Sequence, residues 1–215
     1  MAGQAWALAS NITGDNRYVA KLEAMFQATA GSAYHLWNPE YGLFYRDMRF
    51  LNKTYPNGKM YAWGRGNGWA IAATARIMTV IGHQGEAAAF WLPYFRTMAA
   101  SVIALQNATD GMWRASLTDP EVVDNPETTG SALFVYALAY GLRTGVLQGP
   151  EYEQAVSLGW QGLSQVAQQP DGHVGYCQYI GYMPAPANSS STSDFCVGTF
   201  LLAASEVAQL VASRS

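Results

Sequence analysis

A turn motif recurs three times in this chain, each time after a helical segment. It occupies residues 38–45 (NPEYGLFY), 107–114 (NATDGMWR) and 169–176 (QPDGHVGY). In each copy a glycine supplies a positive φ angle, and a short extended apolar stretch follows it. Gly42, Gly111 and Gly172 are 69 and 61 residues apart, and two helical segments fill each interval. The repeat predicts helical hairpins stacked around an axis, because a single hairpin cannot bury both of its faces.

Helical periodicity dominates the rest of the chain, whose apolar positions recur at the spacing of one helix face. These segments are rich in Ala, Leu and Met, which favour helix, and no long alternating strand is visible. The pattern predicts an all-α protein. The expected helices cover residues 2–10, 17–36, 67–81, 88–106, 128–145, 152–168 and 197–212.

Composition and charge exclude several classes of partner. The net charge of −3 and the lack of a Lys/Arg cluster argue against a nucleic-acid partner. The longest apolar run, residues 132–139, is far shorter than the roughly 20 residues of a membrane span, so no membrane partner is expected. His35, His83 and His173 lack the spacing of metal ligands. We therefore predict neither a metal site nor another cofactor.

Two features bear on the compartment. The chain has four N-x-[ST] sequons, which favour a secreted protein, although no signal peptide is visible. Cys177 and Cys196 are separated by a loop rich in Ser and Pro, and a disulfide or two buried thiols fit this pattern equally well. We expect an extracellular location. The sequons begin at Asn11, Asn52, Asn107 and Asn188.

Residues 63–69 (WGRGNGW) are the strongest candidate for a binding site. Glycine is unfavourable inside a helix, so we expect the start of this run to be a loop whose backbone approaches a ligand closely. Trp63, Arg65 and Trp69 would surround that ligand. A guanidinium between two indoles suits an anionic sugar, since the rings stack on the sugar and the guanidinium binds its carboxylate. The alternative is a glycine-rich turn with core tryptophans and a surface arginine.

The WGRGNGW run resembles the signature of the unsaturated rhamnogalacturonyl hydrolases, glycoside hydrolase family 105, and of the related unsaturated glucuronyl hydrolases of family 88. Further similar stretches are residues 38–45, 110–117 (DGMWRASL), 125–132 (NPETTGSA) and 196–207 (CVGTFLLAASEV). The resemblance implies an (α/α)6 toroid of six helical hairpins. A closed ring needs twelve helices and the pattern predicts about seven. We therefore expect residues 1–215 to form an incomplete arc, the C-terminal part of one such domain.

The resemblance also implies a reaction. Its substrates are pectin-derived oligosaccharides with a 4,5-unsaturated uronic acid at the non-reducing end. An Asp protonates the C4=C5 vinyl ether, water adds at C5, and the resulting hemiketal collapses to release the aglycone. The matching Asp would lie upstream of Met1, so the catalytic residue is unknown and we expect this chain alone to have little or no activity. Implied substrate-binding residues are Trp63, Arg65, Asn67, Trp69 and, where the family usually has His, Arg46.

Asp110 and Asp171 are interpreted as turn formers. Glu127 begins a helix, where capping is favoured over chemistry. A non-catalytic carbohydrate-binding remnant of such an enzyme is the alternative function. The aglycone, whether rhamnose, another hexose or a hexosamine, and the oligomeric state are not predicted.

Overall fold

The computed structural model describes residues 2–181 and 183–214, and this part of the chain is mostly helical. The predicted all-α class is confirmed. Met1, which precedes the first predicted helix, lies outside the described residues. Seven described helices are longer than ten residues: α1 (Ala2–Thr13), α2 (Arg17–Gln27), α3 (Gly64–Ile81), α5 (Trp91–Ala104), α6 (Thr128–Arg143), α7 (Pro150–Gly162) and α8 (Asp194–Ala212).

Shorter elements adjust the predicted bounds. The π-helical turns Ala28–Ser32 and Leu163–Ala167 prolong α2 and α7. The helix expected over residues 88–106 is divided into α4 (Gly85–Ala89) and α5. Two 3₁₀ turns, Met48–Phe50 and Pro120–Val123, lie in long connections.

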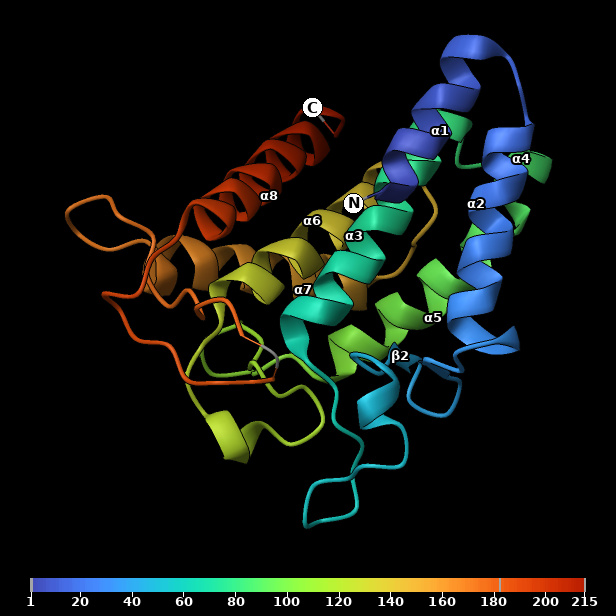
Figure 1. The fold of residues 1–215 in the computed structure, drawn as a ribbon. Coiled ribbons are helices and arrows are strands. Elements are labelled where there is room, and N and C mark those ends of the chain that lie inside the picture. The colour runs from blue at the N-terminus through green and yellow to red at the C-terminus, as the bar shows by residue number, and fades with distance from the viewer. Residues whose placement is uncertain (1, 182, 215) are drawn as a thin grey trace.

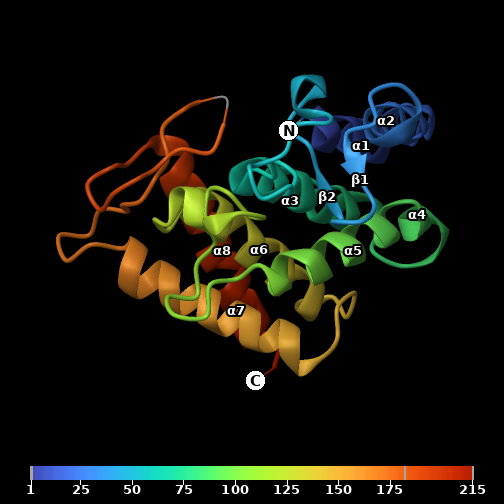
Figure 2. The same ribbon diagram turned by 90° about the horizontal axis from the view of Figure 1, so that it is seen from below.

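The long helices form two layers of an open arc (Figures 1 and 2). In the inner layer α3 packs between α1 and α6, and α6 packs between α3 and α8. In the outer layer α2 covers α1, α5 covers α3 and α6, and α7 covers α6 and α8. Successive hairpins therefore stack side by side, as the repeat predicted, and share one continuous core.

Helix α6 lies at the centre of this core. Every residue of α6 from Thr128 to Gly141 is buried. The apolar run at residues 132–139 is thus a core segment, packed by α3 and α8 on its flanks and by α5 and α7 behind. A helix that is apolar all round is expected where neighbours cover every side.

The three repeated turns have the predicted glycine conformation. The φ angles of Gly42, Gly111 and Gly172 are 62°, 71° and 92°. Each glycine N–H donates a hydrogen bond of 2.9 Å to the carbonyl of the residue that opens its turn, respectively Asn38, Asn107 and Gln169. After the first turn, β2 (Leu43–Phe44) pairs antiparallel with β1 (Trp37–Asn38). The long connections that contain these turns meet at one end of the arc (Figure 1).

Helix α8 closes one side of the arc. Among the described helices it is the one long and apolar enough to cross a bilayer, a length-and-composition test that core helices also pass. Here α8 packs along α6, and its buried Glu206 accepts a hydrogen bond of 2.6 Å from Nε of Arg143. Leu201 and Val211 remain exposed.

Candidate sugar-binding site

The predicted binding residues divide between two hollows on the arc. The Trp63 hollow, of about 420 Å³, opens at the long-connection end and is lined by Thr29, Leu36, Phe44, Tyr45, Arg46, Trp63, Gly66 and Asn67. The Trp69 hollow, of about 350 Å³, lies among α1, α3, α6 and α8 and is lined by Gln4, Trp69, Ala72, Ala73, Arg76, Leu133 and Leu202. A larger hollow of about 660 Å³ contains Glu23 and Glu86, at the opposite end of the helices and away from every predicted site residue.

Trp63 and its two arginine neighbours form the centre of the site. The guanidinium carbon of Arg65 lies 4.6 Å from the centre of the Trp63 ring, and that of Arg46 lies 5.7 Å from it. The expected order, a guanidinium between two indoles, is therefore wrong: one indole contacts two guanidiniums. Trp69 lines the other hollow because it projects from α3 toward the inner face of the arc. The second ring over Arg65 belongs to Phe195, at 5.2 Å.

The side chain of Arg65 is buried rather than on the surface. It is 5% exposed, and its guanidinium donates to the carbonyls of Gln178 and Tyr179, the latter at 3.0 Å. Burial lowers the pKa of Arg65, while the charge of Glu127 acts in the opposite direction. Arg65 therefore brings a positive charge beneath the site, with its hydrogen bonds directed to the loop at residues 168–193 rather than into the hollow.

Asn67 positions the backbone around the Trp63 hollow. Its Oδ1 accepts from the N–H of Phe44 at 2.8 Å, and its Nδ2 donates to the carbonyls of Phe44 and Trp63, each at 3.1 Å. The amide thus joins the first turn of α3 to strand β2. Its hydrogen bonds are made to the protein backbone, which holds the two walls of the hollow at a fixed separation.

Arg46 is the cation that faces the hollow. It forms an ion pair with Asp47, whose carboxylate also accepts from Arg49. These hydrogen bonds, with that from the Arg49 side chain the largest cause, hold the pKa of Asp47 well below its usual range. Nε of Arg46 is buried and has no hydrogen-bond partner within the described residues. The Arg46 side chain as a whole is 26% exposed, so part of its guanidinium is accessible to a ligand in the hollow.

The glycines of the WGRGNGW run serve helix packing. Helix α3 begins at Gly64, so the expectation that this run opens as a loop is wrong. A Cβ added at Gly68 would lie 2.9 Å from Cβ of Leu133 on α6, and one at Gly64 would lie 2.7 Å from the carbonyl oxygen of Arg114. The gain from this close approach outweighs the low helix propensity of glycine. Of the three, Gly66 lines the Trp63 hollow.

Glu127 is a buried helix cap. It is 1% exposed, and its carboxylate accepts from the N–H groups of Thr129 at 3.1 Å and Gly130 at 2.7 Å, which are orphan donors at the start of α6. Burial raises the pKa of Glu127, and these hydrogen bonds oppose the shift. The capping interpretation is confirmed.

Asp110 and Asp171 also have the predicted turn role. Their Oδ1 atoms accept from the N–H groups of Met112 and His173, respectively. Among the described residues, no three His, Cys, Asp or Glu side chains gather closely enough to hold a metal ion.

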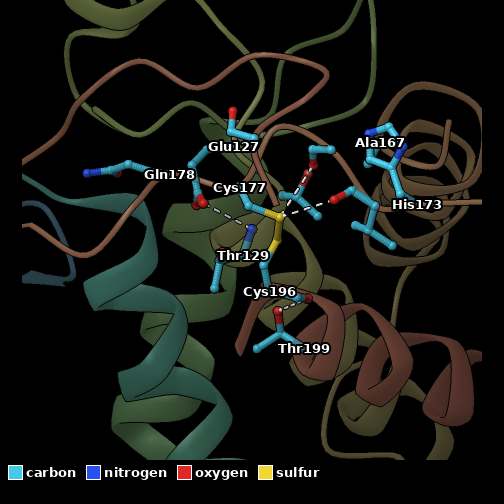
Figure 3. Close-up of a disulfide and its surroundings, with 12 residues drawn as sticks. Glu127, Thr129, Ala167, His173, Cys177, Gln178, Cys196 and Thr199 are labelled. Atoms are coloured by element: carbon cyan, nitrogen blue, oxygen red, sulfur yellow. Dashed lines mark hydrogen bonds between the residues drawn. A yellow bond between two sulfur atoms is a disulfide. The ribbon is translucent and has the colours of Figure 1, made fainter. Parts of the chain in front are cut away.

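The sequence analysis missed two residues of the site, Gln178 and Phe195. Oε1 of Gln178 accepts a hydrogen bond of 2.9 Å from Nε1 of Trp63, and Phe195 contacts Arg65. Cys177 and Cys196 form a disulfide, so of the two possibilities left open the structure has the bridge (Figure 3). Each missed residue is the sequence neighbour of a bridged cysteine, which is the signal that could have found them.

Comparison with known proteins identifies the family. The sequence profile described as Glycosyl Hydrolase Family 88 matches residues 1–211. The chain belongs to this family. A family 88 glycosyl hydrolase from Bacteroides vulgatus has a similar solved structure, with a TM-score of 0.88 and 33% sequence identity, covering 97% of this chain and 60% of that chain. The arc of hairpins is therefore the family 88 toroid fold, as predicted.

Two curated relatives reach similar identity. An unsaturated 3S-rhamnoglycuronyl hydrolase of Alteromonas sp. (strain LOR) is 35% identical over 207 residues, 96% of this chain and 49% of the relative. Another, from Formosa agariphila, is 39% identical over 181 residues, 81% of this chain and 48% of the relative. The chain thus spans about half the length of these relatives.

Proposed function

We propose that the Trp63 hollow binds the 4,5-unsaturated uronyl end of an oligosaccharide. The protein would remove this residue by vinyl-ether hydration, as the family 105 hydrolases that the sequence resembles do. The observation that carries the proposal is Arg46, the one charged residue among the described residues that line the hollow. A uronate carboxylate is a planar acceptor whose two oxygens suit a guanidinium.

The surroundings of Arg46 fit a sugar acid. Phe44, Tyr45 and Trp63 line the same hollow and offer apolar surface to the hydrophobic face of a pyranose ring. Arg65 adds a second positive charge 4.6 Å from the Trp63 ring, in a position sheltered from water. Sheltered charges act over longer distances than exposed ones, which favours an anionic ligand over a neutral sugar.

For the substrate we propose a rhamnose-containing disaccharide that carries the unsaturated uronate. Pectin-derived rhamnogalacturonan fragments are the first candidate, following the resemblance. Rhamnoglycuronyl oligosaccharides are the second candidate, and the names of the two curated relatives support them. Both share the unsaturated uronyl group, the part that Arg46 and Trp63 would recognise.

The test is binding of lyase-generated unsaturated disaccharides to residues 1–215, measured by isothermal titration calorimetry. The saturated disaccharide is the matched ligand. We expect Arg46→Ala to weaken binding about tenfold or more, as loss of a charge-assisted hydrogen bond implies. Arg17→Ala, at a 91% exposed side chain at the start of α2, serves as the control. Equal affinity for saturated and unsaturated ligands, or no effect of Arg46→Ala, would overturn the proposal.

The non-catalytic remnant is tested by the same proteins. Loss of the absorbance of the unsaturated uronate reports hydrolysis, whereas calorimetry reports binding alone. A protein that contains this chain and binds the unsaturated disaccharide without consuming it would be a carbohydrate-binding remnant. Consumption of the substrate supports the hydrolase.

We also propose that the protein works outside the cytosol. The Cys177–Cys196 bridge is typical of oxidising compartments, and the Asn11, Asn52 and Asn188 sequons are exposed. Expression through a eukaryotic secretory pathway should give a mass that falls on enzymatic deglycosylation, together with no titratable thiol. A secreted product with unmodified asparagines and two free thiols would contradict this location.

A further inference from the structure

Gln178 connects the loop at residues 168–193 to both of the residues at the centre of the site. Its Oε1 accepts from Nε1 of Trp63 at 2.9 Å, and its backbone carbonyl accepts from the guanidinium of Arg65. Its Nε2 donates to the carbonyl of Met183 at 2.8 Å. The side chain is 1% exposed, so all three hydrogen bonds are sheltered from water. Gln178 therefore fixes the orientation of the indole relative to the guanidinium.

The Cys177–Cys196 disulfide lies directly beside these contacts. Cys177 precedes Gln178, and Cys196 follows Phe195, whose ring lies 5.2 Å from the guanidinium carbon of Arg65. The bridge joins the loop to the first turn of α8, and Figure 3 shows the Gln178 side chain directed away from the sulfur atoms. Thus Gln178 and Phe195, two of the residues that contact Arg65, are each one peptide bond from the bridge.

On the far side of Gln178 the backbone is held by Arg65, whose guanidinium donates to the carbonyl of Tyr179 at 3.0 Å, but the side chains point to solvent. Tyr179 and Ile180 are 66% and 88% exposed. On the near side, the backbone is held where the N–H of Thr128 donates to the carbonyl of Tyr176 at 3.0 Å and the N–H of Cys177 donates to Ser191 at 2.9 Å. The bridge adds a covalent constraint between residues 19 positions apart, and such a constraint removes open conformations of the loop.

We infer that Gln178 is a positioning residue for Trp63 and Arg65, and that the Cys177–Cys196 bridge holds it in place. The inference rests on the proposed function only where sugar binding is the readout. With the bridge reduced, the loop loses its covalent link to α8, and the hydrogen bond from Trp63 to Gln178 opens part of the time. The indole that lines the hollow is then less ordered, and the ligand binds more weakly. Reduction adds two electrons and two protons and gives two thiols. A dithiol reagent supplies both.

The first measurement needs no sugar. The indole N–H signal of Trp63 is assigned by nuclear magnetic resonance with Trp63→Phe, and its solvent exchange is followed in three variants. Gln178→Met removes the acceptor at similar side-chain size, Gln178→Glu keeps an acceptor oxygen, and the double variant Cys177→Ala/Cys196→Ala removes the bridge. Gln165→Met, at an exposed glutamine after α7, is the control. We expect faster exchange in Gln178→Met and in the bridge variant, and near-normal exchange in Gln178→Glu and the control.

The second measurement is the dissociation constant of the lyase-generated unsaturated disaccharide. We expect Gln178→Met to weaken binding about tenfold, and Gln178→Glu to restore most of it, because one sheltered hydrogen bond orients the binding side chain. If the indole signal responds as expected but no protein binds the disaccharide, the proposed function fails and the positioning role stands. If Trp63 exchange is unchanged by both Gln178→Met and loss of the bridge, the positioning role is overturned, whatever the sugar does.

Discussion

Trp63 and Arg65 are two positions apart in the sequence, and the guanidinium carbon of Arg65 lies 4.6 Å from the centre of the Trp63 ring. Trp63 occupies the position just before α3 and lines a hollow, whereas Arg65 lies within the first turn and is buried. One side chain is therefore available to a ligand, and the other supports it from below. This division of roles leads to predictions that separate binding from stability.

Replacing Arg65 is expected to destabilise the fold. Arg65→Ala leaves the carbonyls of Gln178 and Tyr179 without donors and removes two ring contacts. We expect a loss of about 2–4 kcal/mol in the free energy of unfolding, in the range seen when a buried hydrogen-bonded charge is removed. Urea denaturation followed by circular dichroism measures it. Arg17→Ala, at an exposed ion pair, should change the midpoint little. A loss no larger than in this control would refute the buried role.

Two glycines of α3 should respond to alanine in opposite directions. At Gly68 the new Cβ would lie 2.9 Å from Cβ of Leu133, so overpacking is expected to cost about 1–3 kcal/mol. At Gly66 the nearest atoms are 3.8 Å away, and the higher helix propensity of alanine should stabilise by about 0.5 kcal/mol. Thermal melting of both variants under identical conditions checks this. Equal shifts would mean that the α3–α6 contact is looser than described.

Loop order near the bridge should depend on pH through His173 and Asp171. Hydrogen bonds to Ser189 and Asp171 raise the pKa of His173. The protonated ring therefore stabilises the loop below the free pKa of about 6.5, and this stabilisation is lost as pH rises through the higher pKa of the folded state. Hydrogen bonds from His173 lower the pKa of Asp171. The ionised carboxylate therefore stabilises the loop above the free pKa of about 3.9, and this stabilisation is lost as pH falls through the lower pKa of the folded state.

Between about pH 4 and 6.5, Asp171 should therefore be ionised and His173 protonated, so that the ion pair is fully formed. Titration of the His173 ring signals by nuclear magnetic resonance should give a midpoint above the free value, and Asp171→Asn should lower it. Asp124→Asn, in another loop, is the control. A His173 midpoint at or below the free value would contradict the hydrogen-bond assignment.

Glu127 should act as a cap and not as an acid. Glu127→Ala removes the acceptor for Thr129 and Gly130 at the start of α6 and is expected to cost about 1–2 kcal/mol. Glu127→Gln keeps an acceptor oxygen and should cost less. Urea unfolding gives both values. A variant with unchanged stability but altered turnover in a protein active on unsaturated disaccharides would assign chemistry to Glu127 instead.

Residues 1–215 alone are expected to show little or no turnover of unsaturated disaccharides. A general acid must be protonated and within reach of the double bond, and it typically contributes about 10²–10⁴-fold. Beside the Trp63 hollow, the pKa of Asp47 is held low by Arg49 and Arg46, and Glu127 is buried. Loss of the unsaturated uronate absorbance is the measurement. Turnover equal to that of a full-length relative would show that an acid lies within these residues.

The sequence by itself determined the hairpin repeat and its turns. The φ angles at Gly42, Gly111 and Gly172 follow from local chemistry, because glycine reaches the left-handed region without a steric penalty. Helix periods likewise depend on residues a few positions apart, so the all-α class could be read from the pattern. The glycine-rich start of α3 misled the same reasoning, since Gly68 is there to let Leu133 of α6 pack closely and not to open a loop.

Only the tertiary structure decided how the site is built. The hydrogen bond from Trp63 to Gln178 joins residues 115 positions apart, and Phe195 reaches Arg65 from the first turn of α8. Neither contact can be recognised from sequence periodicity, because each depends on how α3, α6 and α8 converge at one end of the arc. For the same reason Trp69, six residues after Trp63, lines a separate hollow. Short-range preferences set the elements, whereas packing set the direction in which each functional side chain points.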